Sequence, residues 1–115
     1  MTLKVDVNAV SDLLREIARG HVTAETWHDG GSAWFVRASG FLIEVFDDAG
    51  EADYVENVVD PSGTTATFRQ FTNALGYDPI DQLSESDRKQ LGERLRGDFW
   101  AARVPKKPRG KKKRR

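Results

Sequence analysis

The chain has 115 residues, of which 38% are apolar and 10% aromatic, which is enough for one globular domain with a hydrophobic core. It has no cysteine, which excludes disulfides, thiolate metal sites and a cysteine nucleophile. The formal net charge is zero, from 18 basic and 18 acidic side chains, but these charges are unevenly distributed.

Half of the cations lie at one end of the chain. From Arg103 onward there are nine basic residues and no acidic one, so residues 1–102 carry 18 acidic and nine basic side chains. We therefore divide the chain into an acidic domain (residues 1–102) and a basic tail (residues 103–115). Because the tail contains Pro105 and Pro108 and few groups to bury, it is expected to be disordered when free. Such a charge asymmetry points to binding partners rather than to a reaction.

No apolar run reaches the roughly 18 to 20 residues that cross a bilayer. The first 20 residues include Asp6, Asp12 and Glu16, unlike the basic and then apolar profile of a signal peptide. We expect a cytoplasmic protein without membrane insertion.

Apolar residues near the start of the chain follow a helical spacing. They recur at intervals of three and four positions, as on a helix with one buried face: Val10, Leu13, Leu14, Ile17 and Ala18. Asp6 or Asn8 can cap the start of this helix, and Gly20 can supply the left-handed residue that ends it. The polar side chains of the helix have mixed signs and are expected to face solvent: Asp12, Arg15, Glu16 and Arg19.

Short segments rich in aromatic and β-branched residues come next. Residues 34–37 and 41–46 are separated by Ser39-Gly40 and predict a hairpin. In the second segment both faces are largely apolar, which favours a central position in the sheet.

A third strand is predicted over residues 53–59. The turn Asp60-Pro61-Ser62-Gly63 closes it, because proline presets the second turn position and glycine suits the fourth. Residues 64–67 are a candidate for a short fourth strand.

Helical spacing returns after residue 67. A short helix with a Thr67 cap and a Gly76 stop is predicted from Phe68, Phe71 and Leu75. Asp78-Pro79 can start one further turn. Ser84 followed by Asp87 resembles a capping box that begins a last helix, which ends near Arg103 and buries Leu91, Leu95 and Phe99.

These elements predict an α+β fold. It has an N-terminal helix, a three-stranded antiparallel meander and two to three C-terminal helices packed on one face, followed by the disordered basic tail.

Common enzyme signatures are missing from the sequence. There is no phosphate-binding P-loop, no Gly-x-Ser-x-Gly elbow and no His-Glu-x-x-His. Gly30-Gly31-Ser32 is followed by no lysine and precedes a strand, so we interpret it as a loop rather than a phosphate cradle. We expect no enzyme activity, no catalytic residue and no cofactor.

Both histidines, His21 and His28, fall in residues 21–32, which show no periodicity. Glu25 and His28 have the Glu-x-x-His spacing of carboxylate-bridged metal pairs, but such a site needs a second copy and further glutamates. We therefore predict surface or loop histidines and no metal site.

The densest cluster of charge is acidic, with no base between Arg37 and Arg69: Glu44, Asp47, Asp48, Glu51, Asp53, Glu56 and Asp60. The candidate partner-binding residues surround the predicted turn: Asp47, Asp48, Glu51 and Asp53. A docking face for a basic partner, including mimicry of nucleic acid, competes with three alternatives. These are a divalent cation site, whose spacing is not that of a calcium loop, a paired-carboxylate acid/base site, and an ordinary solvated turn.

The basic tail suits phosphate backbones, because it is cationic and has no aromatic residue for stacking on bases. The candidate nucleic-acid-binding residues are Lys106, Lys107, Arg109, Lys111, Lys112, Lys113, Arg114 and Arg115. The alternatives are a solubilising extension, an anchor on acidic lipid or the ribosome, a nuclear localisation signal, and a segment that folds back on the acidic domain.

Several short motifs resemble a family of short bacterial proteins, known mainly from pseudomonads and their relatives and classed as a domain of unknown function. They are Leu14 to Gly20, Phe41 to Asp48, Asp53-Tyr54-Val55, Asp60 to Gly63, Gly76 to Pro79 and Leu83-Ser84. The resemblance covers about residues 7–96 and implies no activity, cofactor or catalytic residue. Members often have a cysteine after the second strand, where this chain has Asp48-Ala49.

Together these features predict a small non-enzymatic binding protein. Its acidic domain is expected to meet a basic protein partner, and its tail to contact nucleic acid non-specifically. The alternatives are a nucleic-acid-mimicking inhibitor protein of a mobile element and a small enzyme with a carboxylate site.

Overall fold

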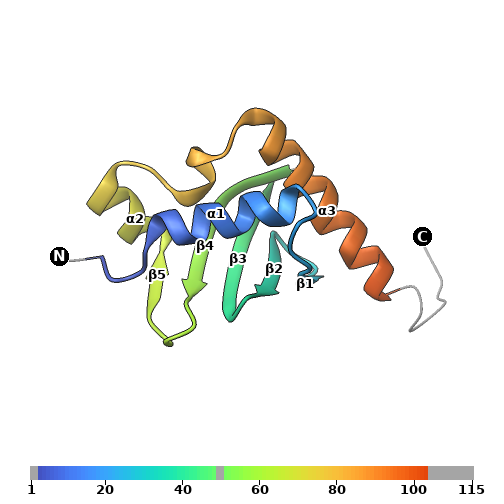
Figure 1. Ribbon diagram of the computed structural model, residues 1–115, viewed down its shortest axis with the longest axis horizontal. Helices are drawn as coiled ribbons and strands as arrows, with labels where there is room; N and C mark the ends of the chain where they lie inside the picture. The colour runs from blue at the N-terminus through green and yellow to red at the C-terminus, as the bar shows by residue number, and fades with distance from the viewer. Residues whose placement is uncertain (1–2, 49–50, 104–115) are drawn as a thin grey trace.

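The computed structural model describes the backbone of residues 3–48 and 51–103, and side chains as far as residue 96. The elements in chain order are α1 (Val7–Ala18), β1 (Glu25–His28), β2 (Ala33–Ala38), β3 (Phe41–Asp48), β4 (Glu51–Val59), β5 (Thr65–Thr67), α2 (Phe68–Leu75), the 3₁₀ turn η1 (Pro79–Gln82) and α3 (Glu85–Arg103) (Figure 1). In the part of the chain that is described, no helix is long and apolar enough to cross a membrane. The predictions for residues 104–115 and for the Phe99 side chain lie outside the described residues.

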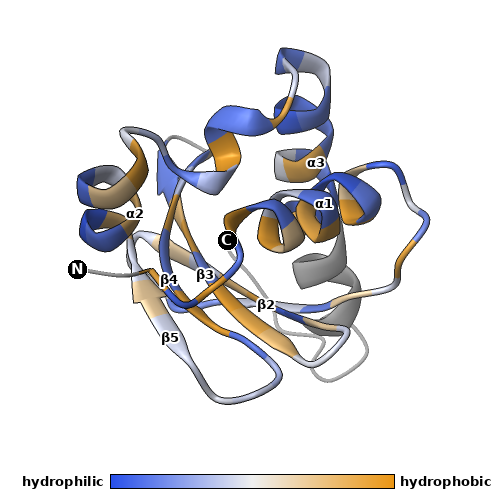
Figure 2. Ribbon diagram, turned by 60° about the vertical axis from the view of Figure 1, so that its left-hand side comes forward, coloured by the Kyte–Doolittle hydropathy of each residue, from blue (hydrophilic) through white to orange (hydrophobic). Residues whose placement is uncertain are grey.

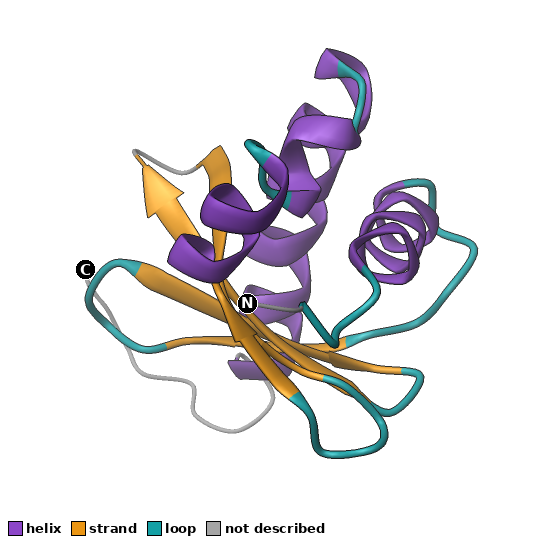
Figure 3. Cartoon of the chain, turned by 90° about the vertical axis from the view of Figure 1, so that its left-hand side faces the viewer, coloured by secondary structure: helices purple, strands orange, loops and turns teal. Residues whose placement is uncertain are grey.

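The five strands form one antiparallel sheet in the order β1-β2-β3-β4-β5, and the helices lie on one side of it (Figure 3). The α+β fold is confirmed, but the prediction of three strands was wrong. The candidate fourth strand forms as β5, and β1 was missed. Four residues are too few to show a period, so β1 is defined by its pairing with β2, in which Trp27 lies opposite Phe35.

The predicted hairpin and the central position of β3 are both confirmed. Ser39 and Gly40 have φ angles of 51° and 83°, and these left-handed conformations at both turn positions match the twist of the flanking strands. A β-bulge interrupts the pairing of β3 with β4, because Glu44 pairs with Asn57 and Val45 with Val55. Glu56 is the extra residue of this bulge.

The core lies between the helices and the covered face of the sheet (Figure 2). The strands and the helices contribute side chains that are fully buried: Val36, Ile43, Val45, Val55, Val58, Leu14, Ile17, Phe71, Leu91 and Leu95. Burial of each such side chain stabilises the fold by about 1.5–3 kcal/mol.

Helix α1 begins where predicted, because the Asp6 carboxylate accepts hydrogen bonds from the backbone of Asn8 and Ala9. The polar face is exposed at Asp12 and Arg19, as expected, but two of its arginines also contact α3. Arg19 donates two hydrogen bonds, of 3.1 and 3.0 Å, to the buried carboxylate of Asp87 in α3, and Arg15 lies 4.0 Å from it. The Arg19 hydrogen bond is the main cause that lowers the pKa of Asp87. These ion pairs join the first and last helices.

Helix α2 and turn η1 also match the prediction. Thr67 and Gln70 form a reciprocal capping box at the start of α2, and Gly76 ends it at φ 84°. Asp78 caps η1 by accepting from the Ile80 N–H, and its buried carboxylate also accepts from Val55 N–H of β4. One side chain thus ties η1 to the sheet.

Candidate functional site

Among the described residues, no helix lies against the second face of the sheet (Figure 3). The strand register puts on this face the side chains that alternate with those of the core. We call this surface the open face; it consists of Glu25, Trp27, Phe35, Arg37, Leu42, Glu44, Phe46, Tyr54, Asn57, Val59, Thr65 and Thr67.

Aromatic rings cover two regions of the open face. Trp27 stacks on Phe35 with ring centroids 5.5 Å apart, and Phe46 stacks on Tyr54 at 4.8 Å. Phe68, which directly follows β5, lies 4.4 Å from the Tyr54 ring. All five rings are half-buried, so each still presents part of its surface to solvent.

One cation is already bound to these rings. The Arg37 guanidinium lies 5.1 Å from the centre of the Trp27 ring and donates a 3.0 Å hydrogen bond to Glu25. A ring and a carboxylate therefore hold a guanidinium group from two sides, which combines a cation–π contact with a charge-assisted hydrogen bond.

Glu44 lies in the middle of the open face, opposite Phe35 on one side and Asn57 on the other. It borders a cavity of about 470 Å³ together with Glu56, Asn57, Thr67, Phe68 and Arg69. Burial, with further contributions from Glu56 and Asp29, raises the pKa of Glu44. In the described part of the chain, neither Glu44 nor Glu56 has a side-chain hydrogen bond or ion pair. The two carboxylates form an acidic centre beside an aromatic wall.

We expect the Glu44→Gln variant to have a higher melting temperature than the wild type at pH 7. Because the folded carboxyl has a raised pKa, its contribution to stability is complete below the unfolded pKa of 4.5 and is lost as the pH rises through the folded pKa. The gain in the variant should therefore shrink towards pH 4, which thermal unfolding between pH 4 and 8 will measure. Glu93→Gln, at an exposed position of α3, is the control. A variant less stable than wild type at pH 7 would show that the carboxylate has a stabilising partner.

The structure brings only two of the four predicted partner-binding residues together. Asp48 and Glu51 are exposed and lie opposite each other where β3 meets β4, and Asp53 is half-buried on β4. Asp47 points instead to the covered side, where its carboxylate lies 3.0 Å from Nε2 of His28. The structure thus brings together Asp48 and Glu51 but assigns Asp47 a contact within the fold.

His28 is not a surface or loop residue, as was expected, but a half-buried residue of β1. Its Nδ1 accepts a 3.0 Å hydrogen bond from Gly30 N–H, so Nε2 carries the proton that is donated to Asp47. Its ring also meets the Trp34 ring edge-on. Glu25 and His28 are three apart in a strand and so face opposite sides, which prevents their joint use as metal ligands. No group of three or more potential metal ligands occurs among the described residues.

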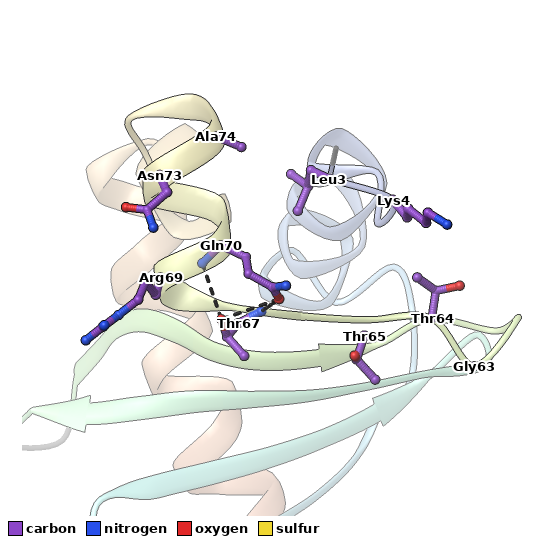
Figure 4. Close-up of a pocket in the computed structure, with 10 residues that line it drawn as sticks. All are labelled: Leu3, Lys4, Gly63, Thr64, Thr65, Thr67, Arg69, Gln70, Asn73 and Ala74. Atoms are coloured by element: carbon purple, nitrogen blue, oxygen red, sulfur yellow. Dashed lines mark hydrogen bonds between the residues drawn. The ribbon is translucent and has the colours of Figure 1, made fainter. Parts of the chain in front are cut away.

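A groove of about 660 Å³ separates the N-terminal segment from α2 and the β4–β5 turn (Figure 4). It is lined by Leu3, Lys4, Gly63, Thr64, Thr65, Thr67, Arg69, Gln70, Asn73 and Ala74. The hydrogen bonds drawn in its wall belong to the capping box of Thr67 and Gln70. These polar groups therefore serve the start of α2.

The candidate nucleic-acid-binding residues, Lys106 to Arg115, lie outside the described part of the chain. Sequence reasoning did not identify the open face as a candidate site. The alternation of Leu42, Glu44 and Phe46 was the available signal: a carboxylate between two large apolar side chains on the second face of a central strand.

The fold and the open face define a small α+β protein with a five-stranded antiparallel meander, whose described helices all lie on one side of the sheet. Residues 4–97 match the family model described as "Domain of unknown function (DUF7693)", and the chain belongs to this family. No curated protein and no solved structure matches the chain.

Proposed function

We propose that the protein is a non-enzymatic binding protein, whose acidic domain binds a basic protein partner on the open face and whose basic tail contacts nucleic acid. The observation that carries the proposal is the acidic centre of Glu44 and Glu56 beside the rings of Phe68 and Tyr54. A lysine or arginine side chain suits such a place, because rings and carboxylates attract it together.

The Arg37 contact supports this assignment from within the molecule. It shows that a guanidinium group fits between a ring and a carboxylate on this same face. The region around Glu44 offers the same two groups with no ion pair from the described residues. Burial also raises the pKa of Glu44, and shifted pKa values are common among the residues of binding sites.

The proposal predicts that a short arginine-rich peptide binds the open face. Peptide titrations should use a full-length variant in which the eight lysine and arginine residues at 106–115 are replaced with glutamine, so that the tail does not compete. In this tail-neutral background, Glu44→Gln combined with Glu56→Gln is expected to lower the affinity for the peptide about tenfold or more. The reason is that charge-assisted hydrogen bonds contribute about 1.5–3 kcal/mol to binding. Isothermal titration calorimetry measures the effect.

The matched control replaces Glu85 and Glu93, two exposed glutamates of α3 on the other side of the sheet, with glutamine. It makes the same change in net charge and should leave the affinity unchanged. Equal loss in both double variants would mean that only net charge matters, and would refute the open face as the binding site.

The tail is tested separately with a labelled DNA duplex. Binding by the wild-type chain should weaken steeply with salt: neutralisation of about five phosphates gives a log–log slope near −4.5. The tail-neutral variant should lose this binding. Retained affinity in that variant would contradict a role for the tail.

Nucleic-acid mimicry is the second candidate, because Asp48 and Glu51 expose two like charges directly opposite each other. Like charges in this position cost stability, so a partner that neutralises them would relieve the repulsion. Charge reversal of Asp48 and Glu51 would then abolish binding of a DNA-binding partner, whereas Glu44→Gln with Glu56→Gln would leave it intact.

A further inference from the structure

We infer that the open face also binds the chain's own basic tail, so that the tail and a basic partner compete for one surface. This rests on the proposed function, because it assigns a second occupant to the same face. Charge, chain length and the course of α3 support it.

The charges of the two parts are complementary. The basic tail carries nine cations and no acid, whereas residues 1–102 have an excess of nine acidic side chains. Glu25 of the open face is paired with Arg37, but Glu44 on this face and Glu56 beside it at the cavity have no ion pair within the described residues. Arg69 lines the same cavity as these two glutamates and contributes a positive charge there. The unpaired carboxylates are thus available to lysine and arginine side chains.

The tail begins close to the β1 edge of the sheet, from which it can reach the open face. Helix α3 packs against β1, the edge strand, and its last turns extend past this edge (Figure 1). The twelve residues after Arg103 span at most about 40 Å when extended. Crossing from β1 to β5 requires four strand spacings, or roughly 19 Å. The tail is long enough to reach Glu44 and Glu56 from the β1 edge.

Tethering makes a weak contact effective. A short flexible connection gives an effective concentration on the order of 1 mM. If the tail alone bound the face with a Kd of about 0.1 mM, about nine chains in ten would be closed, and nucleic acid or a basic partner would bind about tenfold more weakly. Because screening limits the fields of exposed charges to about 8 Å at physiological salt, closure should be strongest at low salt.

The test compares amide chemical shifts of the ¹⁵N-labelled full-length wild type and the tail-neutral variant at 20 mM salt. We expect differences on the open face, around Phe35, Glu44 and Asn57, and not in α1. The differences should largely disappear at 500 mM salt. They should also disappear in the Glu44→Gln/Glu56→Gln chain, but persist in the Glu85→Gln/Glu93→Gln control.

A DNA duplex added to the wild type should shift the open-face amides towards their positions in the tail-neutral variant, because it withdraws the tail. Identical open-face shifts in wild type and variant at low salt would overturn the inference. Shift differences that grow with protein concentration would overturn it too, by showing contact between copies. Since these measurements contain no peptide, peptide binding without tail-dependent shifts would leave the proposed function standing alone.

Discussion

The Phe71→Ala variant is expected to lose about 3–5 kcal/mol of unfolding free energy. Phe71 is fully buried and is the one buried side chain of α2, so its removal leaves a cavity and releases that helix from the sheet. The loss should appear as a lower denaturation midpoint in urea with an unchanged slope.

Leu75→Ala is the control for this variant, because Leu75 belongs to the same helix but is 37% exposed. It should cost less than about 1 kcal/mol. Phe71→Ala should also weaken arginine-peptide binding, since α2 positions Phe68 against Tyr54. A Phe71→Ala variant as stable as Leu75→Ala would contradict the packing of α2 described above.

The second large effect is expected at Asp78. The Asp78→Ala variant should lose about 2–4 kcal/mol of unfolding free energy at pH 5. Its carboxyl group accepts from the N–H groups of Val55 and Ile80, and each buried donor left without a partner costs about 1–3 kcal/mol. Urea unfolding of the wild type and of the Asp78→Ala variant measures the difference. No loss at pH 5 would show that water replaces the carboxyl group.

Asp78 also makes stability depend on pH. Burial is the main cause that raises its pKa from 3.8 to about 7. Between pH 3.8 and about 7, the folded chain therefore holds a proton on Asp78 that the unfolded chain has lost. The free energy of unfolding is thus highest below pH 3.8, declines as the pH rises and levels off above about pH 7. An Asp78→Asn chain should lack this decline, and a parallel decline in both chains would assign it to another group.

Local signals account for most of the fold. Asp6, Thr67 and Gly76 cap helices as predicted, and Ser39-Gly40 forms the predicted hairpin turn. These features depend on hydrogen bonds or backbone angles within a few residues, which sequence spacing can show. Strand β1 was missed because pairing with a distant partner, not its own pattern, defines it.

The contacts that sequence reasoning missed join distant parts of the chain. Asp87 was recognised beside a capping serine, but its bonds to Arg19 span 68 positions. Asp78 was predicted to start a turn, whereas its bond to Val55 spans 23 positions. The open face was missed because the alternation of Leu42, Glu44 and Phe46 marks a second face of β3 without showing whether helices cover it.

Strand β4 continues well beyond its partner β5, which pairs only with Asn57, Val58 and Val59. Along residues 51–56 no described strand occupies this outer edge, where the Asp78 carboxylate accepts the N–H of Val55. Such an edge can template the addition of a strand from another molecule, and charged side chains oppose that addition. Glu51, Asp53 and Glu56 would therefore keep the protein dispersed at high concentration, whatever partner it binds.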